Sequence, residues 1–199
     1  EAGAALSGHA GRNSISFTGA VGVGKLVQAA AARNVVPVTL ELGGKSPQVV
    51  FSDTDLDAAL PFLVNAGIQN AGQTCSASSR IVVERGLHDR VVEAMAKRYA
   101  GLRVGPAEAD LDVGPLISGR QKEIVEGYLG KADGLEVAGR GEIVANAPSA
   151  GHYVAPHLLT GAGADHRLAQ EEIFGPVQVV IPFDDEEEAV AIANGTEFG

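Results

Sequence analysis

The feature that most constrains the fold is a strand–glycine turn–helix–strand pattern in residues 14–42. Residues 14–19, SISFTG, alternate in polarity and end on glycine, as a strand does. Residues 21–33, VGVGKLVQAAAAR, are rich in helix formers and end on arginine, which suits a helix C-terminus. Residues 35–42, VVPVTLEL, predict a second strand, parallel to the first because a helical crossover returns the chain in the same direction. This pattern predicts an α/β fold, in which such glycine turns bind nucleotide phosphates.

The rest of the chain repeats this alternation of strands and helices. The pattern restarts after Gly43 and Gly44, so we expect one domain over residues 1–43 and another over 44–199. Pro61 lies inside a predicted helix and suggests a kink or a late helix start. The predicted strands are residues 47–51, 80–84, 135–139, 141–145, 152–160 and 177–183. The predicted helices are 57–67, with several N-cap candidates at 52–57, and 88–102, 119–131 and 184–195.

Composition and charge exclude several classes of protein. The formal net charge of −10 opposes nucleic-acid binding, which depends on clustered Lys and Arg. No apolar run approaches the ~20 residues of a membrane-spanning helix. A single cysteine cannot form an internal disulfide, which favours a reducing compartment, the cytoplasm. Because the chain begins at Glu1 and stops directly after a predicted helix, we expect it to be a piece of a longer protein.

No metal site is predicted. The five histidines show no ligand spacing such as H-E-x-x-H. The acidic run at residues 184–188, DDEEE, is typical of a solvated helix N-terminus, where acids complement the helix dipole.

The sole cysteine, Cys75, lies in a stretch of small and polar residues, NAGQTCSASSR, at 70–80. The stretch has no apolar period, so it predicts a tight connection that small ligands can approach. A lone thiol there is a candidate nucleophile, although a single cysteine is more often a small buried apolar residue.

Residues 19–26, GAVGVGKL, nearly match the phosphate-binding P-loop G-x-x-x-x-G-K-[ST]. Leu26 stands where that motif needs a hydroxyl for Mg²⁺. The dinucleotide fingerprint G-x-G-x-x-G also fails, because the spacing of the glycines is reversed. The turn therefore predicts a phosphate-bearing ligand without naming it, or else an ordinary glycine turn.

Two further segments carry candidate acids. Glu41 opens ELGGKSP (41–47) at the end of an apolar strand, where loss of hydration would favour a general base; it could equally be an ordinary strand-end glutamate. QEEIFGPV (170–177) places two acids and an aromatic before a Gly-Pro turn, which by itself indicates only a turn before a strand.

Taken together, four motifs resemble those of the aldehyde dehydrogenase superfamily. They are FTGAVGVGK (17–25), LELGGKSP (40–47), GQTC (72–75) and EEIFGPV (171–177). They occur in the family's order, with 34 residues (75 − 41) from Glu41 to Cys75 and 97 (172 − 75) from Cys75 to Glu172. The resemblance spans the chain and corresponds to the middle of the family's sequence.

The resemblance implies a role for each matching residue. Cys75 corresponds to the family's nucleophile and Glu41 to its general base. Ala20 departs from the serine often found after the first glycine of the nucleotide turn. The positions implied to bind NAD or NADP are Gly19, Ala20, Val23, Gly24, Leu42, Glu172 and Phe174.

The implied fold is the C-terminal part of a Rossmann-like nucleotide-binding domain, residues 1–43, followed by most of an α/β catalytic domain. The implied reaction oxidises an aldehyde to a carboxylic acid through a cysteine thiohemiacetal and thioester, in a homo-oligomer (dimer or tetramer). The family's second oxyanion donor, its adenosine-binding lysine and part of its substrate pocket lie outside residues 1–199, so we expect this piece alone to be inactive. The alternatives are a CoA-acylating member of the superfamily, a P-loop-like nucleotide hydrolase and a non-catalytic oligomer component.

Overall fold

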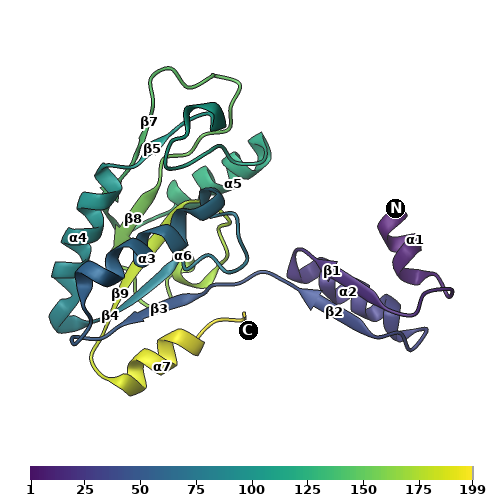
Figure 1. Cartoon of the computed structure of the whole chain (residues 1–199). Helices are drawn as coiled ribbons and strands as arrows, with labels where there is room; N and C mark the ends of the chain where they lie inside the picture. The colour runs from purple at the N-terminus through teal and green to yellow at the C-terminus, as the bar shows by residue number, and fades with distance from the viewer. Residues whose placement is uncertain (199) are drawn as a thin grey trace. The chain divides into compact units, whose positions relative to one another are not determined.

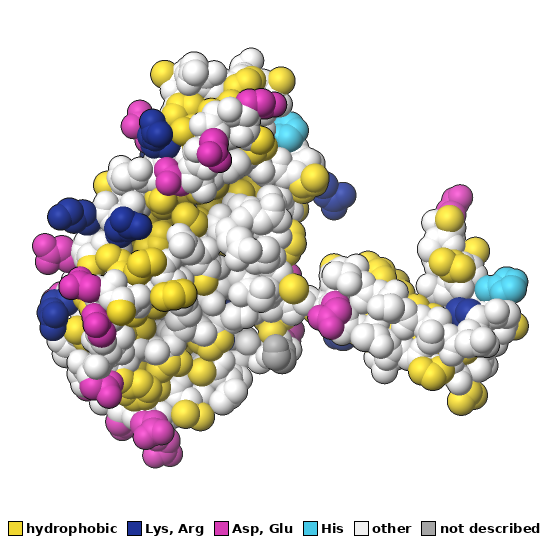
Figure 2. All heavy atoms as spheres, in the orientation of Figure 1, with side chains coloured by type: hydrophobic (Ala, Val, Ile, Leu, Met, Phe, Trp, Pro, Cys, Tyr) yellow, Lys and Arg dark blue, Asp and Glu magenta, His cyan; other side chains and the backbone are white. Residues whose placement is uncertain are grey.

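The computed structural model describes residues 1–198. The chain forms two compact units, Glu1–Gly43 and Gly44–Gly199, which are described separately (Figure 1). On the face of the larger unit in Figure 2, Lys and Arg side chains are interspersed with Asp and Glu rather than gathered in one patch. No helix within residues 1–198 is long and apolar enough to cross a membrane.

The first unit is a two-stranded parallel sheet with two helices. Its elements are α1 (Ala2–Gly8), β1 (Ile15–Thr18), α2 (Val21–Ala32) and β2 (Val38–Glu41). Ile15 pairs with Val38 and Thr18 with Glu41, which confirms the predicted parallel crossover. Helix α2 can approach β2 closely because position 24 is glycine: a Cβ there would lie 2.6 Å from Leu42 Cδ2.

The second unit is built on a five-stranded sheet in the order β3-β4-β9-β8-β6. All neighbours are parallel except β6 and β8, which are antiparallel. The strands are β3 (Pro47–Val50), β4 (Arg80–Glu84), β6 (Glu136–Arg140), β8 (His157–Thr160) and β9 (Val177–Phe183). A separate two-stranded sheet joins β5 (Arg103–Val104) to β7 (Glu142–Ile143).

Helices cover both faces of this sheet. Side chains of consecutive strand residues point to opposite faces. Gln178 of β9 contacts Leu63 and Tyr99, whereas Arg80, paired with Val179, contacts Ile192 and Ala193. Thus α3 and α4 lie on one face and α7 on the other. The helices are α3 (Leu56–Ile68), α4 (His88–Ala100), α5 (Gly119–Leu129), α6 (Arg167–Gln170) and α7 (Glu186–Asn194), and the 3₁₀ turns are η1 (Gln69–Gly72), η2 (Arg85–Leu87) and η3 (Ala107–Ala109).

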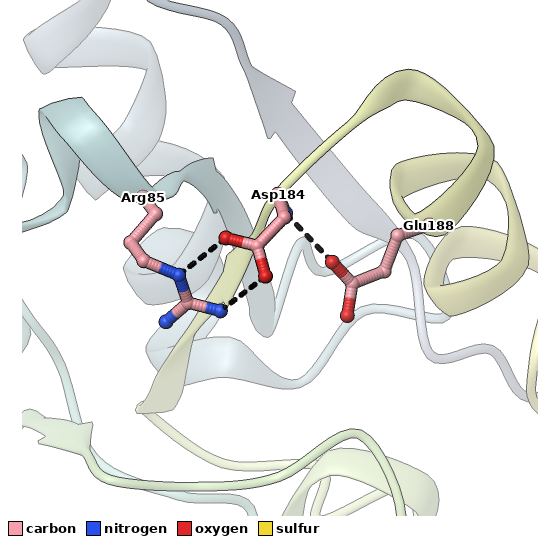
Figure 3. A network of polar contacts seen from close by, with 3 residues as sticks. All are labelled: Arg85, Asp184 and Glu188. Carbon is pink, nitrogen blue, oxygen red and sulfur yellow. Dashed lines mark hydrogen bonds and ion pairs between the residues drawn. The ribbon is translucent and has the colours of Figure 1, made fainter.

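The acidic run 184–188 forms the start of α7, as predicted. Asp185 caps the helix by accepting from the Glu188 N–H at 2.9 Å, and Glu188 accepts from the Asp184 N–H at 2.6 Å. The Asp184 carboxylate also forms a two-pronged ion pair with the Arg85 guanidinium, and Figure 3 shows the three side chains. This pair holds the pKa of the exposed Asp184 carboxyl below its ordinary value, chiefly through the hydrogen bonds from Arg85.

One local prediction is wrong, and one of the two alternatives offered for Pro61, a late helix start, is excluded. The strand predicted over residues 152–160 begins only at His157, because Pro156 has no N–H for a strand ladder. Helix α3 begins at Leu56, where the Asp55 carboxylate accepts from the Ala58 N–H at 3.2 Å, so Pro61 does not delay the helix.

Candidate active site

Cys75 lies on an exposed turn that follows an unusual left-handed segment. Asn70, Ala71 and Gly72 have φ values of 51°, 54° and 72°. Alanine in this conformation costs about 1–2 kcal/mol, and such strain is typical of functional sites. The Asn70 and Gln73 side chains brace the turn, each donating to the backbone carbonyl of the other residue at 3.1 and 3.0 Å. The thiol is exposed, contrary to the buried alternative for a lone cysteine.

Gly72 brings the GQTC and EEIFGPV segments together. A Cβ at position 72 would lie 2.1 Å from the carbonyl oxygen of Gly175. Only a residue without a side chain allows these two backbones to approach so closely.

Gly44 brings ELGGKSP to the same place. A Cβ at position 44 would lie 2.3 Å from the carbonyl oxygen of Cys75. The Gly44 N–H also donates to Glu172 Oε1 at 3.1 Å. Cys75, Gly44 and Glu172, which are far apart in sequence, therefore meet at one site within the second unit.

The loop that carries Phe174 is held by Gln121, which lies on α5. Its side-chain amide donates to the carbonyls of Ile173 and Phe174 at 3.1 and 2.9 Å. Phe174 has φ of 56° and keeps its ring partly exposed, at 37%. Sequence reasoning missed Gln121, because nothing in the GRQKEIV pattern shows which loop the helix faces.

Glu171 is fixed by partners rather than free. Tyr128 donates to its carboxylate at 2.7 Å and Arg167 at 3.0 Å, and the Arg167 guanidinium lies 4.6 Å from the centre of the Tyr128 ring. Hydrogen bonds from Arg167 and then Tyr128 lower the pKa of Glu171. Glu171 is thus tied to α5 and α6, while the neighbouring Glu172 accepts from the Gly44 N–H.

Lys45, which follows Gly44 in the chain, is a buried lysine that sequence reasoning also missed. Its side chain is 2% exposed, and its Nζ has no hydrogen-bond partner among the described residues. Burial, with a smaller contribution from the charge of Arg80, lowers the pKa of Lys45 from 10.5 to about 7, although the charges of Glu172 and Glu171 act to raise it. The Lys45 carbonyl accepts from Arg80 Nε at 2.7 Å.

The other predicted cofactor residues surround the start of α2 in the first unit. Ala20 is the helix N-cap and provides no side-chain cap; its carbonyl accepts from the N–H groups of Val23 and Gly24, both at 3.0 Å. The Gly19 N–H donates to the Glu41 carbonyl at 3.0 Å, which joins the turn to the end of β2. The uncapped helix N-terminus is suited to an anion such as phosphate.

Glu41 lies at the end of β2, as predicted, but the expectation that it is buried is wrong. In β2, Val38 and Leu40 are half-buried, while Thr39 and Glu41 are exposed. The two-stranded sheet alternates between a covered and an uncovered face, and Glu41 falls on the uncovered one.

The fold and the site define the class of protein. The family model described as "Aldehyde dehydrogenase family" matches residues 1–199. The chain belongs to the aldehyde dehydrogenase family.

Particular relatives support this membership. Betaine aldehyde dehydrogenases of Rhizobium leguminosarum bv. trifolii and Mesorhizobium japonicum are 39% and 41% identical over the whole chain. The crystal structure of a Burkholderia cenocepacia protein assigned as an aldehyde dehydrogenase has 58% identity and a TM-score of 0.98 over 100% of this chain and 42% of its own. A Staphylococcus aureus betaine aldehyde dehydrogenase in complex with NAD⁺ has 36% identity and a TM-score of 0.93, over 100% of this chain and 40% of its own. The chain spans 42% of the length of the curated relatives.

Proposed function

We propose that this chain is the central part of an enzyme, here called the full-length protein, that oxidises an aldehyde to a carboxylic acid with NAD⁺ or NADP⁺. One observation carries the proposal: Gly44, Cys75 and Glu172 meet at one site, held by backbone contacts that only glycine permits. In this proposal residues 1–43 belong to the nucleotide-binding domain and residues 44–199 to the catalytic domain.

The first step uses the exposed thiol. The thiolate of Cys75 adds to the aldehyde carbon, and the carbonyl oxygen becomes an oxyanion. The Cys75 N–H makes no backbone hydrogen bond within residues 1–198, so it is available as a donor to that oxyanion.

The residues present fit a dinucleotide cofactor. The uncapped start of α2 is suited to a pyrophosphate, and Gly24 lets that helix pack directly on Leu42. Glu172 and Phe174 would hold the nicotinamide ribose and ring. A bound NAD⁺ or NADP⁺ would supply the hydride acceptor, so that the tetrahedral carbon attached to Cys75 would become a thioester carbonyl.

Hydrolysis completes the reaction. Glu41 accepts a proton from a water molecule, the resulting hydroxide attacks the thioester carbon, and the Cys75 thiolate leaves with release of a carboxylic acid. The role of Glu41 is supported by its place in the LELGGKSP motif and by family membership.

The test uses the full-length protein with NAD⁺ or NADP⁺ and a panel of aldehydes that includes betaine aldehyde, the substrate in the names of two relatives. Cys75→Ala should abolish NAD(P)H formation. Glu41→Gln should still form the acyl-enzyme, detected by mass spectrometry on Cys75, but should hydrolyse it slowly.

Three outcomes would contradict the proposal or redirect it. Turnover that survives Cys75→Ala would exclude covalent catalysis by this thiol. Release of product only when coenzyme A is added would identify an acylating member of the family. ATP hydrolysis unaffected by either substitution would support the nucleotide hydrolase.

A further inference from the structure

A hydrogen-bonded glutamine lies in the core between the central strand β9 and helices α3 and α4. Gln178 and Tyr99 are both completely buried. Gln178 Nε2 donates to the carbonyl of Ser78 at 2.6 Å and to that of Leu63 at 2.9 Å, and Gln178 Oε1 accepts from the Tyr99 hydroxyl. Because carbonyl oxygens only accept, these partners determine which end of the amide is nitrogen.

The neighbouring helix makes room for this side chain. A Cβ at position 67 would lie 2.1 Å from Gln178 Cδ. Gly67 lies inside α3, where glycine costs about 1 kcal/mol relative to alanine. The packing therefore accommodates a glutamine side chain at position 178, even though an apolar side chain there would need no hydrogen-bond partners.

The network acts directly on the loop that carries the thiol. Ser78 is three residues after Cys75, and its N–H donates to the Ala66 carbonyl of α3 at 3.0 Å. Its carbonyl accepts from Gln178. Both backbone groups of Ser78 are thus attached to the core, one through α3 and the other through β9.

Burial keeps the network in one protonation state. Loss of hydration raises the pKa of the Tyr99 hydroxyl far above its ordinary value, so the hydroxyl stays protonated and remains a donor at neutral pH. The groups in these contacts, an amide, a hydroxyl and two backbone carbonyls, are all uncharged.

We propose that Gln178 is a positioning residue that holds the Cys75 loop in its reactive geometry through the carbonyl of Ser78. The inference rests on the proposed function. It assigns to a buried core residue, outside all four sequence motifs, an effect on the rate of reaction at the thiol. A displacement of about 1 Å at a reacting group can cost about 100-fold in rate, so we expect a loss of about 10- to 100-fold.

The test compares four variants of the full-length protein. Gln178→Met has a similar volume but removes both donors. Tyr99→Phe removes the hydroxyl, and the double variant Gln178→Met/Tyr99→Phe leaves no unpaired tyrosine hydroxyl in the core. Val91→Ala, on the buried side of α4, is the control that loses stability by creating a cavity away from the network.

Two readouts separate positioning from folding. The first is the kcat and KM for aldehyde oxidation, and the second is the rate at which iodoacetamide alkylates Cys75, followed on its peptide by mass spectrometry. Urea unfolding gives the stability of each variant. We expect Gln178→Met to lower kcat and the alkylation rate about 10- to 100-fold, with KM for the cofactor within about twofold.

The double variant decides the question. Its stability should recover relative to Gln178→Met, because replacing both partners of a buried hydrogen bond removes an unpaired group. Its reactivity should not recover, because the Ser78 carbonyl still lacks its donor.

Three results would overturn the inference. The first is wild-type alkylation and kcat in Gln178→Met, the second is reactivity that recovers together with stability in the double variant, and the third is an equal loss of alkylation in Val91→Ala. If the wild type oxidises no aldehyde, the proposed function fails, but the alkylation comparison still tests the role of Gln178.

Discussion

Gly72→Ala tests whether the close approach of two backbones creates the active site. At this position φ is 72° and the new Cβ would lie 2.1 Å from the Gly175 carbonyl oxygen. Real Cβ atoms essentially never lie within 3.0 Å of such an atom, so the Cys75 turn and the Gly175 segment must separate by roughly 1 Å or more. The obstacle is backbone, which cannot rotate away as a flexible side chain can.

The expected effects follow from this geometry. The left-handed backbone adds about 1–2 kcal/mol of strain for alanine, so stability should fall by at least that amount. A displacement of about 1 Å near the reacting group predicts a loss of about 100-fold in kcat. The measurements are urea unfolding and aldehyde-dependent NADH formation by the full-length protein, together with alkylation of Cys75.

Gly127→Ala is the matched control. Gly127 is an exposed residue inside α5, and a Cβ there would meet no atom within 4 Å. Alanine should stabilise the helix by about 0.5–1 kcal/mol and leave kcat unchanged. Wild-type kcat and alkylation in Gly72→Ala would refute the claim that this contact positions the thiol.

Two further substitutions test the buried cations. The pKa of Lys45 is about 7 in the fold, against an ordinary value of 10.5. Between these pH values the unfolded chain therefore binds more protons, and the free energy of unfolding rises with pH. Lys45→Met should therefore be more stable than wild type by up to about 5 kcal/mol near pH 7. Urea unfolding should show that this gain is smaller at pH 10 than at pH 7. A gain in stability that is the same at both pH values would contradict the argument. Arg80 donates to the carbonyls of Lys45, Ile192 and Ala193 at 2.7, 2.7 and 2.8 Å. The single amine of lysine cannot reach all three carbonyls, so Arg80→Lys should lower the free energy of unfolding by about 3 kcal/mol, measured in urea. Unchanged stability would show that these contacts contribute little.

Local sequence predicted most of the secondary structure, because the signals are carried by neighbouring residues. The alternating run before the Gly19 turn and the helix formers after it predicted β1 and α2, and the β-branched run at residues 177–183 predicted β9. The four motifs also predicted the family, which the match over residues 1–199 confirms.

Local sequence failed where the answer depends on what covers a residue. Glu41 follows apolar neighbours and was expected to be buried, but the alternation of the strand places it on the uncovered face of β2. From the sequence alone, Gln178 is one residue of a predicted buried strand. Only the packing of Gly67 and Tyr99 around it shows why a polar side chain is stable at this position.

The sequence by itself determined the chemistry that is available: one thiol, the carboxylates of its motifs, and a glycine turn before a helix. The tertiary structure alone decided which of these groups meet. Gly44, Cys75 and Glu172 are separated by 31 (75 − 44) and 97 (172 − 75) residues, yet two glycine contacts and one hydrogen bond bring their segments together. The physical reason is that motifs are local patterns of residue types, whereas close backbone approach and burial arise only when strands β3, β4 and β9 pair side by side.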